Sequence, residues 1–283
     1  MKKFGTAALA LALTGALAVP ALAAETPVLI SANPNAYSTS ISLNGEKLDT
    51  AGIPGVPNAL LPMRLLAEAD HGNAYWDQEN NQSWFTFGQN RITVDFDDDS
   101  VTVNDQPVTV SGMEVVNGVT FLTADVFTGW DGYTVEWAGA AGDGANAVTI
   151  TTPNNDPMVK LAYAIMESSE MFGSRTYEDM LTDAYKIPAD QFQQVVAFFP
   201  MITSPDTVII GKLAEGADQK AVTDALEAYR QQQEDTFSWY LSQNLPKVQD
   251  ARTVVENGYV LFFIGENPDE AEALFHSYVK AQG

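Results

Sequence analysis

The chain has 283 residues, no cysteine and a formal net charge of −23. The absence of cysteine excludes disulfides, thiolate metal ligands, a cysteine nucleophile and an acylated N-terminal cysteine. The acidic balance excludes binding that relies on clustered Lys and Arg, so neither nucleic acid nor an anionic lipid surface is an expected partner.

The N-terminus has the three parts of a secretory signal. Lys2 and Lys3 precede an apolar, Ala-rich run over 4–19, and Ala21-Leu22-Ala23 fits an A-x-A cleavage site. We expect a signal peptide over 1–23, whose removal would take away two lysines and change the net charge to −25. The run is shorter than the ~20 residues that a spanning helix needs, so we expect no membrane span after cleavage. The sequence therefore predicts a secreted or noncovalently envelope-associated protein.

After a linker over 24–40, residues 41–152 predict a mainly β domain. Short alternating apolar runs are separated by Asn44-Gly45, Asn104-Asp105 and Asn117-Gly118. Such pairs accept the positive φ of a two-residue hairpin turn, and the flanking alternation buries one face of each strand.

This domain contains an internal repeat. The stretch from Leu61 to Leu66 followed by Tyr75-Trp76-Asp77 returns 61 residues later, as Leu122 to Phe127 followed by Glu136-Trp137-Ala138. Each copy predicts a short helix before an aromatic strand, a unit too small to bury its own apolar face. We therefore expect the two copies, with two short helices, to pack into one domain.

Residues 157–283 predict an α+β domain in which helices pack on a small sheet. The Pro-containing segment Thr151 to Pro157 breaks the strand pattern and marks the boundary. Asp156 and Asp218 are expected to cap helices, and the Asn257-Gly258 turn predicts a hairpin. Helical spacing of Phe192, Val195, Val196 and Phe199 predicts a short helix, and Asn267 with Glu270 a capping box.

The first domain resembles the copper amine oxidase-like N-terminal domain, or stalk domain, of exported proteins from Gram-positive bacteria. The segments that carry this resemblance are ISLNGEKL, LLPMRLLAEADHGNAYWD, ITVDFDDDSVTVNDQPV and VVNGVTFLTADVFTGWDGYTVEW. The second copy has Thr123-Ala124-Asp125 in place of the usual Pro-x-Arg. The resemblance implies a noncatalytic domain with neither copper nor a quinone, and we expect no cofactor.

The second domain is similar to a family of unknown function found in exported proteins and lipoproteins of anaerobic Gram-positive bacteria. FFPMITSPDTVIIGKL, AVTDALEAYRQQQEDTF and ARTVVENGYVLFFIGENPDEAEALF carry this similarity. It implies no activity.

Two groups of residues are candidate sites. Asp95, Asp97 and Asp99 are a weak cation candidate, because hard cations bind several carboxylate oxygens, but the EF-hand spacing is missing and a solvated turn is favoured. Trp76, Trp84 and Trp137 are expected in the core. Trp130 lies in a turn and is the tryptophan to test for exposure, and Trp130 and Tyr133 are the candidate ligand-binding residues.

No catalytic motif is present. The chain lacks G-x-S-x-G, H-E-x-x-H, a P-loop and G-x-G-x-x-G, and its two histidines, His71 and His276, have no recognisable catalytic partner. Gly139, Gly142 and Gly144 predict a hairpin loop, since no helix follows to bind phosphate.

Three hypotheses follow. The first is a noncatalytic stalk or adhesion-type scaffold, and the second is a module that binds glycan or peptidoglycan. The third is a hydrolase that uses paired carboxylates. Expected partners are a cell-wall glycan or another envelope protein, and the sequence leaves the oligomeric state open.

Overall fold

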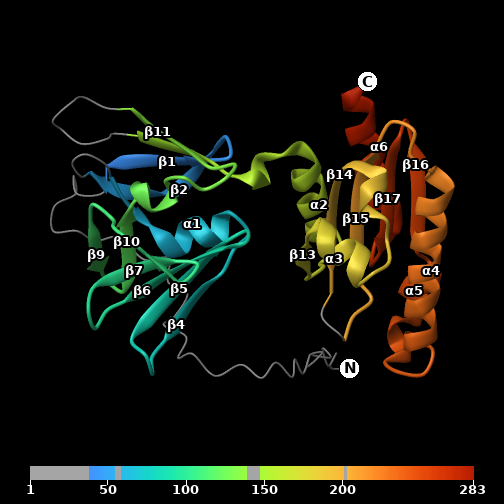
Figure 1. The fold of residues 1–283 in the computed structure, drawn as a ribbon, viewed down its shortest axis with the longest axis horizontal. Helices are drawn as coiled ribbons and strands as arrows, with labels where there is room; N and C mark the ends of the chain where they lie inside the picture. Colours follow the sequence, from blue (N-terminus) through green and yellow to red (C-terminus); the bar gives the residue numbers. More distant parts are fainter. Residues whose placement is uncertain (1–37, 55–58, 139–146, 201–202) are drawn as a thin grey trace, which may run out of the picture. The chain divides into compact units, whose positions relative to one another are not determined.

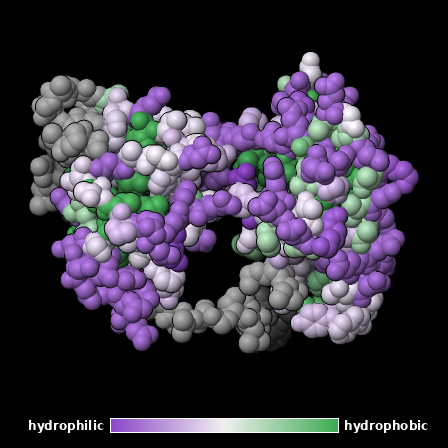
Figure 2. Space-filling view, viewed as in Figure 1, coloured by the Kyte–Doolittle hydropathy of each residue, from purple (hydrophilic) through white to green (hydrophobic). Residues whose placement is uncertain are grey.

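The structure, a computed structural model, describes residues 38–54, 59–138, 147–200 and 203–283. The chain divides into two compact units at the boundary between Ile150 and Thr151. We call these the β unit and the C-terminal unit (Figure 1). No helix in the described ranges is long and apolar enough to cross a membrane. Figure 2 shows many hydrophilic residues on the visible face of each unit, with hydrophobic residues also exposed on both.

In its described residues, the β unit has two sheets, one α-helix and one 3-10 helix. Its elements are β1 (Thr39–Leu43), β2 (Glu46–Pro54), β3 (Ala59–Pro62), α1 (Met63–Ala69), β4 (Ala74–Asp77), β5 (Gln82–Phe87), β6 (Asn90–Asp95), β7 (Ser100–Val103), β8 (Gln106–Val108), β9 (Met113–Val116), β10 (Val119–Thr123), η1 (Ala124–Phe127), β11 (Thr134–Ala138) and β12 (Ala147–Thr151).

The two sheets share one hydrophobic core. The seven-stranded sheet has the order β11-β12-β1-β2-β3-β10-β9, and the five-stranded sheet has the order β4-β5-β6-β7-β8. Helix α1 contacts β3 and β10 of the first sheet and β4 and β5 of the second, and lies between them (Figure 1). Side chains from both sheets and from α1, such as Ile41, Phe85 and Leu66, belong to the same buried cluster. The prediction of a mainly β domain with two short helical segments is confirmed.

The predicted hairpin turns form as the Asn-Gly signals require. Asn44-Gly45, Asn104-Asp105 and Asn117-Gly118 all have positive φ at both positions, between 51° and 89°. This is the geometry of a two-residue turn whose twist matches that of the flanking strands.

The two copies of the repeat meet directly. Strand β3 of the first copy pairs antiparallel with β10 of the second, and Leu61 lies opposite Leu122, its own repeat equivalent. The neighbouring pairs are Leu60 with Thr123 and Pro62 with Phe121. With the 61-residue offset, Leu60 corresponds to Phe121 and Pro62 corresponds to Thr123. Exchanging the copies therefore converts one of these pairs into the other, so a local two-fold axis passes through the Leu61 and Leu122 pair.

Each copy also contributes strands to both sheets. The 61-residue offset also maps β1 onto β7 and the start of β2 onto β8, so the repeat extends back to β1. The first copy gives its hairpin, β1 and β2, to the seven-stranded sheet and its last strand, β4, to the five-stranded sheet. The second copy does the reverse, with β7 and β8 in the five-stranded sheet and β11 in the seven-stranded one. Neither copy can therefore fold as a separate layer, because each sheet needs strands from both.

The C-terminal unit has a single five-stranded sheet with helices on both faces. Its elements are η2 (Pro153–Asn155), α2 (Pro157–Ser168), β13 (Ser174–Thr176), α3 (Glu178–Asp183), η3 (Ala189–Gln191), β14 (Phe192–Phe199), β15 (Thr207–Leu213), α4 (Gln219–Phe237), η4 (Ser242–Asn244), α5 (Leu245–Gln249), β16 (Arg252–Glu256), β17 (Tyr259–Ile264) and α6 (Pro268–Gln282).

This unit has three layers. The antiparallel sheet, in the order β13-β14-β15-β17-β16, packs against α2 and α6 on one face and against α3, α4 and α5 on the other. Along β17, Leu261 and Phe263 face the first core, whereas Val260 and Phe262 face the second. The predicted α+β layer domain is confirmed.

Three local predictions for this unit are correct and two are wrong. The Asn257-Gly258 turn has positive φ at both positions and joins β16 to β17 in a hairpin. Asp156 and Asp218 cap α2 and α4 through their side chains, as predicted. The segment predicted as a helix is strand β14, because both faces of the sheet are covered and β14 shows no clean alternation. The capping box at Asn267 does not form, because Asn267 has a left-handed backbone (φ 56°) and not the extended conformation of a capping residue. Its side-chain amide donates instead to the Ser168 carbonyl, 3.0 Å away.

The Leu61 and Leu122 pair should be the energetic centre of the β unit. Both side chains are fully buried, so Leu61→Ala and Leu122→Ala should each lower the free energy of unfolding by about 2–5 kcal/mol. Because the residues are paired, the double variant should deviate from additivity by about 0.5–3 kcal/mol in denaturant titrations. Leu261→Ala, an equally buried leucine of the other unit, is the control and should be additive with Leu61→Ala. Additive losses for the Leu61 and Leu122 pair would contradict the proposed coupling.

Candidate ligand-binding site

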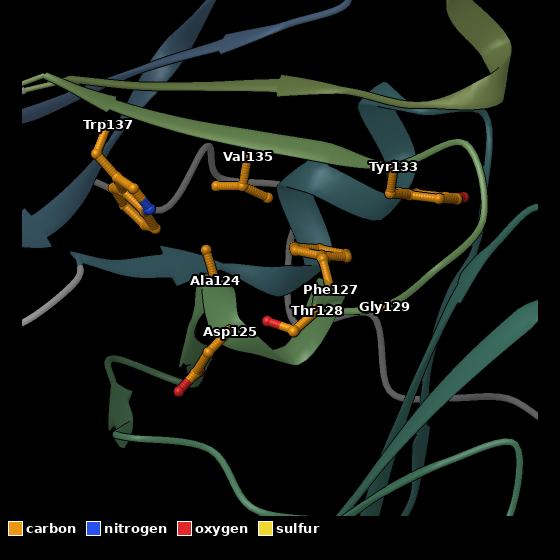
Figure 3. Close-up of a pocket in the computed structure, with 8 residues that line it drawn as sticks. All are labelled: Ala124, Asp125, Phe127, Thr128, Gly129, Tyr133, Val135 and Trp137. Carbon is orange, nitrogen blue, oxygen red and sulfur yellow. The ribbon is translucent and has the colours of Figure 1, made fainter.

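A pocket of about 230 Å³ lies in the β unit between η1 and β11. Figure 3 shows the side chains of Val135 and Trp137 on β11 facing Ala124 and Phe127 of η1. The pocket is smaller than the ~300–1,000 Å³ of sites for drug-sized ligands, so it suits a single ring or one side chain. The residues that line it are Ala124, Asp125, Phe127, Thr128, Gly129, Tyr133, Val135 and Trp137.

A difference between the two repeat copies explains the pocket. In the first copy, α1 has seven residues, whereas its equivalent η1 has four and ends where Thr128 turns to an extended conformation with ψ 128°. The second helical turn of α1 thus has no counterpart beside β11. Thr128 and Gly129, which line the pocket, take its place.

A second difference adds an aromatic wall. Tyr133 is the repeat equivalent of Gly72, where a Cβ atom would lie 1.8 Å from the Thr86 carbonyl oxygen. A side chain is therefore impossible at Gly72, whereas the same position in the second copy carries a ring that lines the pocket.

The pocket has aromatic side chains in its walls, and polar atoms make up the larger share of its accessible lining. Phe127 is buried, whereas Trp137 has 37% of its surface exposed. The Asp125 carboxylate is already engaged in hydrogen bonds within the protein. It accepts from the Ser111 amide, 2.8 Å away, and from the hydroxyls of Ser111 and Thr123. In Figure 3 the Asp125 side chain is directed away from β11, and the Thr128 hydroxyl lies nearer the middle of the pocket than the Asp125 carboxylate does. Aromatic side chains beside a hydroxyl and other polar atoms suit a ligand with one apolar face and several hydroxyls.

The structure separates the two predicted aromatic residues. Tyr133 lines the pocket, but Trp130 does not. Trp130 is partly buried against the main core and makes edge contacts with Phe127 and Tyr133, each with ring centroids 5.1 Å apart. Tyr133 is therefore a ligand-contact candidate, whereas Trp130 supports the pocket wall from behind.

The prediction that Trp76 and Trp137 lie in the core is wrong. Each is 37% exposed, because β4 and β11 are edge strands with a neighbour on one side only. Trp76 packs on Phe96 with centroids 5.6 Å apart, and Trp137 lines the pocket. Trp137 is the site residue that the sequence reasoning missed. Alternation with the exposed Thr134 and Glu136 places Trp137 on the same side of β11 as Val135, so no local signal in the sequence indicated its exposure.

Trp84 lies on the outer face of the five-stranded sheet and not in the core. It is half-buried, beside Tyr75 with centroids 5.2 Å apart and beneath the Arg91 guanidinium, 5.3 Å from its ring. In β5 the inward positions belong to Phe85 and Phe87, so strand alternation places Trp84 outward.

The acidic hairpin over 95–99 forms a turn held by its own side chains. Asp95 accepts from the Gln82 amide, 2.7 Å away, Asp97 accepts from Asn81, and Asp99 has a positive φ. The Gln82 hydrogen bond, followed by that from the Asp97 amide, holds the pKa of Asp95 below its usual value. No group of three or more His, Asp or Glu side chains within the described ranges is arranged to hold a metal ion.

The histidines lie in different units. His71 is exposed in the turn after α1 with φ 59°, and His276 on α6 is hydrogen-bonded to Glu256. The predicted Gly-rich loop with Gly139, Gly142 and Gly144 lies outside the described residues.

Two family models match the chain. Residues 42–143 match the copper amine oxidase N-terminal domain, and residues 168–265 match a domain of unknown function, DUF4358. The chain therefore contains a copper amine oxidase N-terminal domain followed by a DUF4358 domain. The first is a noncatalytic domain, and no catalytic family is identified. A search of curated proteins and a search of solved structures found no match.

Proposed function

We propose that the chain is a noncatalytic exported protein of the cell envelope, in which the β unit is a stalk or adhesion-type module that carries the C-terminal unit. The observation that carries this proposal is the exchange of strands between the repeat copies. This exchange buries the apolar faces of both copies in one shared hydrophobic core. The noncatalytic nature of the matched domain supports the same reading.

The composition of the surface supports an exported binding role. The chain has no cysteine, so its stability outside the cytoplasm rests on its apolar cores. Its net charge of −23 favours solubility and repels anionic polymers and lipids. Neutral glycans or other envelope proteins are therefore the proposed partners.

Export can be tested through the cleavage site. When the full chain is expressed in a Gram-positive host, mass spectrometry should find the mature N-terminus at Ala24 in the envelope or medium. Replacing Ala21 and Ala23 by Leu should block processing, because signal peptidase requires small residues at these positions. Ala12→Leu, inside the apolar run, is the control and should be processed normally. A full-length wild-type chain confined to the cytoplasm would contradict the proposal.

A second function, saccharide binding, is favoured by the pocket between η1 and β11. Its half-exposed Trp137 indole, the Tyr133 ring and the Thr128 hydroxyl lie around one concavity. Aromatic rings stack on the apolar face of a pyranose, and nearby hydroxyls bind its polar rim. This pocket contains only one carboxylate, Asp125, so it favours binding over the hydrolase hypothesis, which needs a carboxylate pair.

The repeat supplies a matched pair of variants for this function. Trp137→Ala should abolish retention of the purified chain on isolated cell wall, because it removes the stacking surface. Trp76→Ala removes the equivalent tryptophan, which is equally exposed but packs on Phe96, and should leave retention unchanged. Trp130→Ala is unsuitable as a test, since it removes support from Phe127 and Tyr133. Equal retention of both tryptophan variants would exclude this pocket as the binding site.

A further inference from the structure

The first and last strands of the β unit are neighbours and run parallel. Strand β1 pairs with β12 through Ser40 with Ala147, Ile41 with Val148, Ser42 with Thr149, and Leu43 with Ile150. The ladder extends past β1 itself, because the Asn44 amide donates to the Ile150 carbonyl over 2.9 Å.

Parallel pairing fixes how this ladder responds to tension. The chain enters the β unit at the start of β1 and leaves it at the end of β12, so these two points lie at opposite ends of the paired strands. Tension between them slides the strands past each other. The evenly spaced bonds of a parallel ladder then share the load and must break together. If the strands were antiparallel, the two points would lie at the same end and the bonds would break one at a time.

The side chains add a second resistance to sliding. Ile41 and Leu43 on β1 and Val148 and Ile150 on β12 are all buried in the main core. Sliding by one residue would turn these side chains from the core toward the opposite face of the sheet. The apolar contacts and the ladder therefore oppose the same displacement.

Strand β1 is also held on its other side. It pairs antiparallel with β2, through Ser42 with Lys47 and Leu43 with Glu46. Pulling β1 out of the sheet in the direction of the strand therefore disrupts two ladders at once.

We propose that the β unit is a load-bearing module in which β1 and β12 form a shear clamp. The clamp transmits tension between an attachment point N-terminal to residue 39 and the C-terminal unit. This inference rests on the proposed stalk function and specifies what the stalk does.

The absence of cysteine allows a direct test. Two introduced cysteines per chain are the only attachment points for DNA handles in an optical trap. Ser38→Cys with Thr151→Cys, in the full chain, loads the clamp in shear. Ser38→Cys with Ala147→Cys is the matched control, because residue 147 pairs with Ser40 and the same force peels the strands apart from one end. Residues 147 and 151 are both half-buried positions of β12, on the same face of the strand.

Forced unfolding is governed by the unfolding rate, so the loading direction should decide the result. At equal loading rates the shear variant should unfold at a several-fold higher force than the peeling variant. Both should release roughly 400 Å of chain, as expected for the residues between the handles. Equal thermal unfolding of the two variants shows that the handles leave stability unchanged. Thr149→Cys with Ser38→Cys should give an intermediate force.

Equal forces in the two directions would overturn the clamp. This outcome is independent of export and of cell-wall binding. A strong clamp in a chain that is not exported would refute the stalk proposal alone, and a weak clamp in an exported, envelope-bound chain would refute the clamp alone.

Discussion

The β unit depends on one pairing, in which Leu61 of β3 lies opposite Leu122 of β10. Each residue is the repeat equivalent of the other, so a single antiparallel contact creates the local two-fold relation between the copies. From this contact each copy sends its helical segment into the shared core and its last strand to the other sheet. The apolar face that one copy cannot bury alone is thereby covered by its partner.

The repeat also explains the parallel pair β1 and β12. In the five-stranded sheet, β5 pairs antiparallel with β6, and β6 pairs antiparallel with β7. Strands β5 and β7 are therefore parallel to each other with β6 inserted between them. In the seven-stranded sheet β12 neighbours β11 as β5 neighbours β4, and β12 pairs directly with β1, the repeat equivalent of β7, with no strand between them. Near-symmetry in sequence thus leaves two structural differences between the copies, the direct parallel pair and the shortened helix beside the pocket.

The sequence predicted architecture better than it predicted surfaces. Asn-Gly turns and the capping residues Asp156 and Asp218 follow local rules, and all formed as predicted. Strand β14 was mistaken for a helix, because burial on both faces removes the period-2 signal. Trp137 was placed in the core, since its exposure depends on the position of β11 at a sheet edge, which only the assembled order of strands reveals.

The central claim is that the two copies form one cooperative body, and native-state hydrogen exchange tests it most directly. Amides of β3 and of β10 should exchange only through global unfolding of the β unit, with the same opening free energy and the same denaturant dependence. Agreement between the slowest amides of both copies is the expected result. A first copy that opens at a lower free energy than the second would show that the copies fold separately, and would contradict the account.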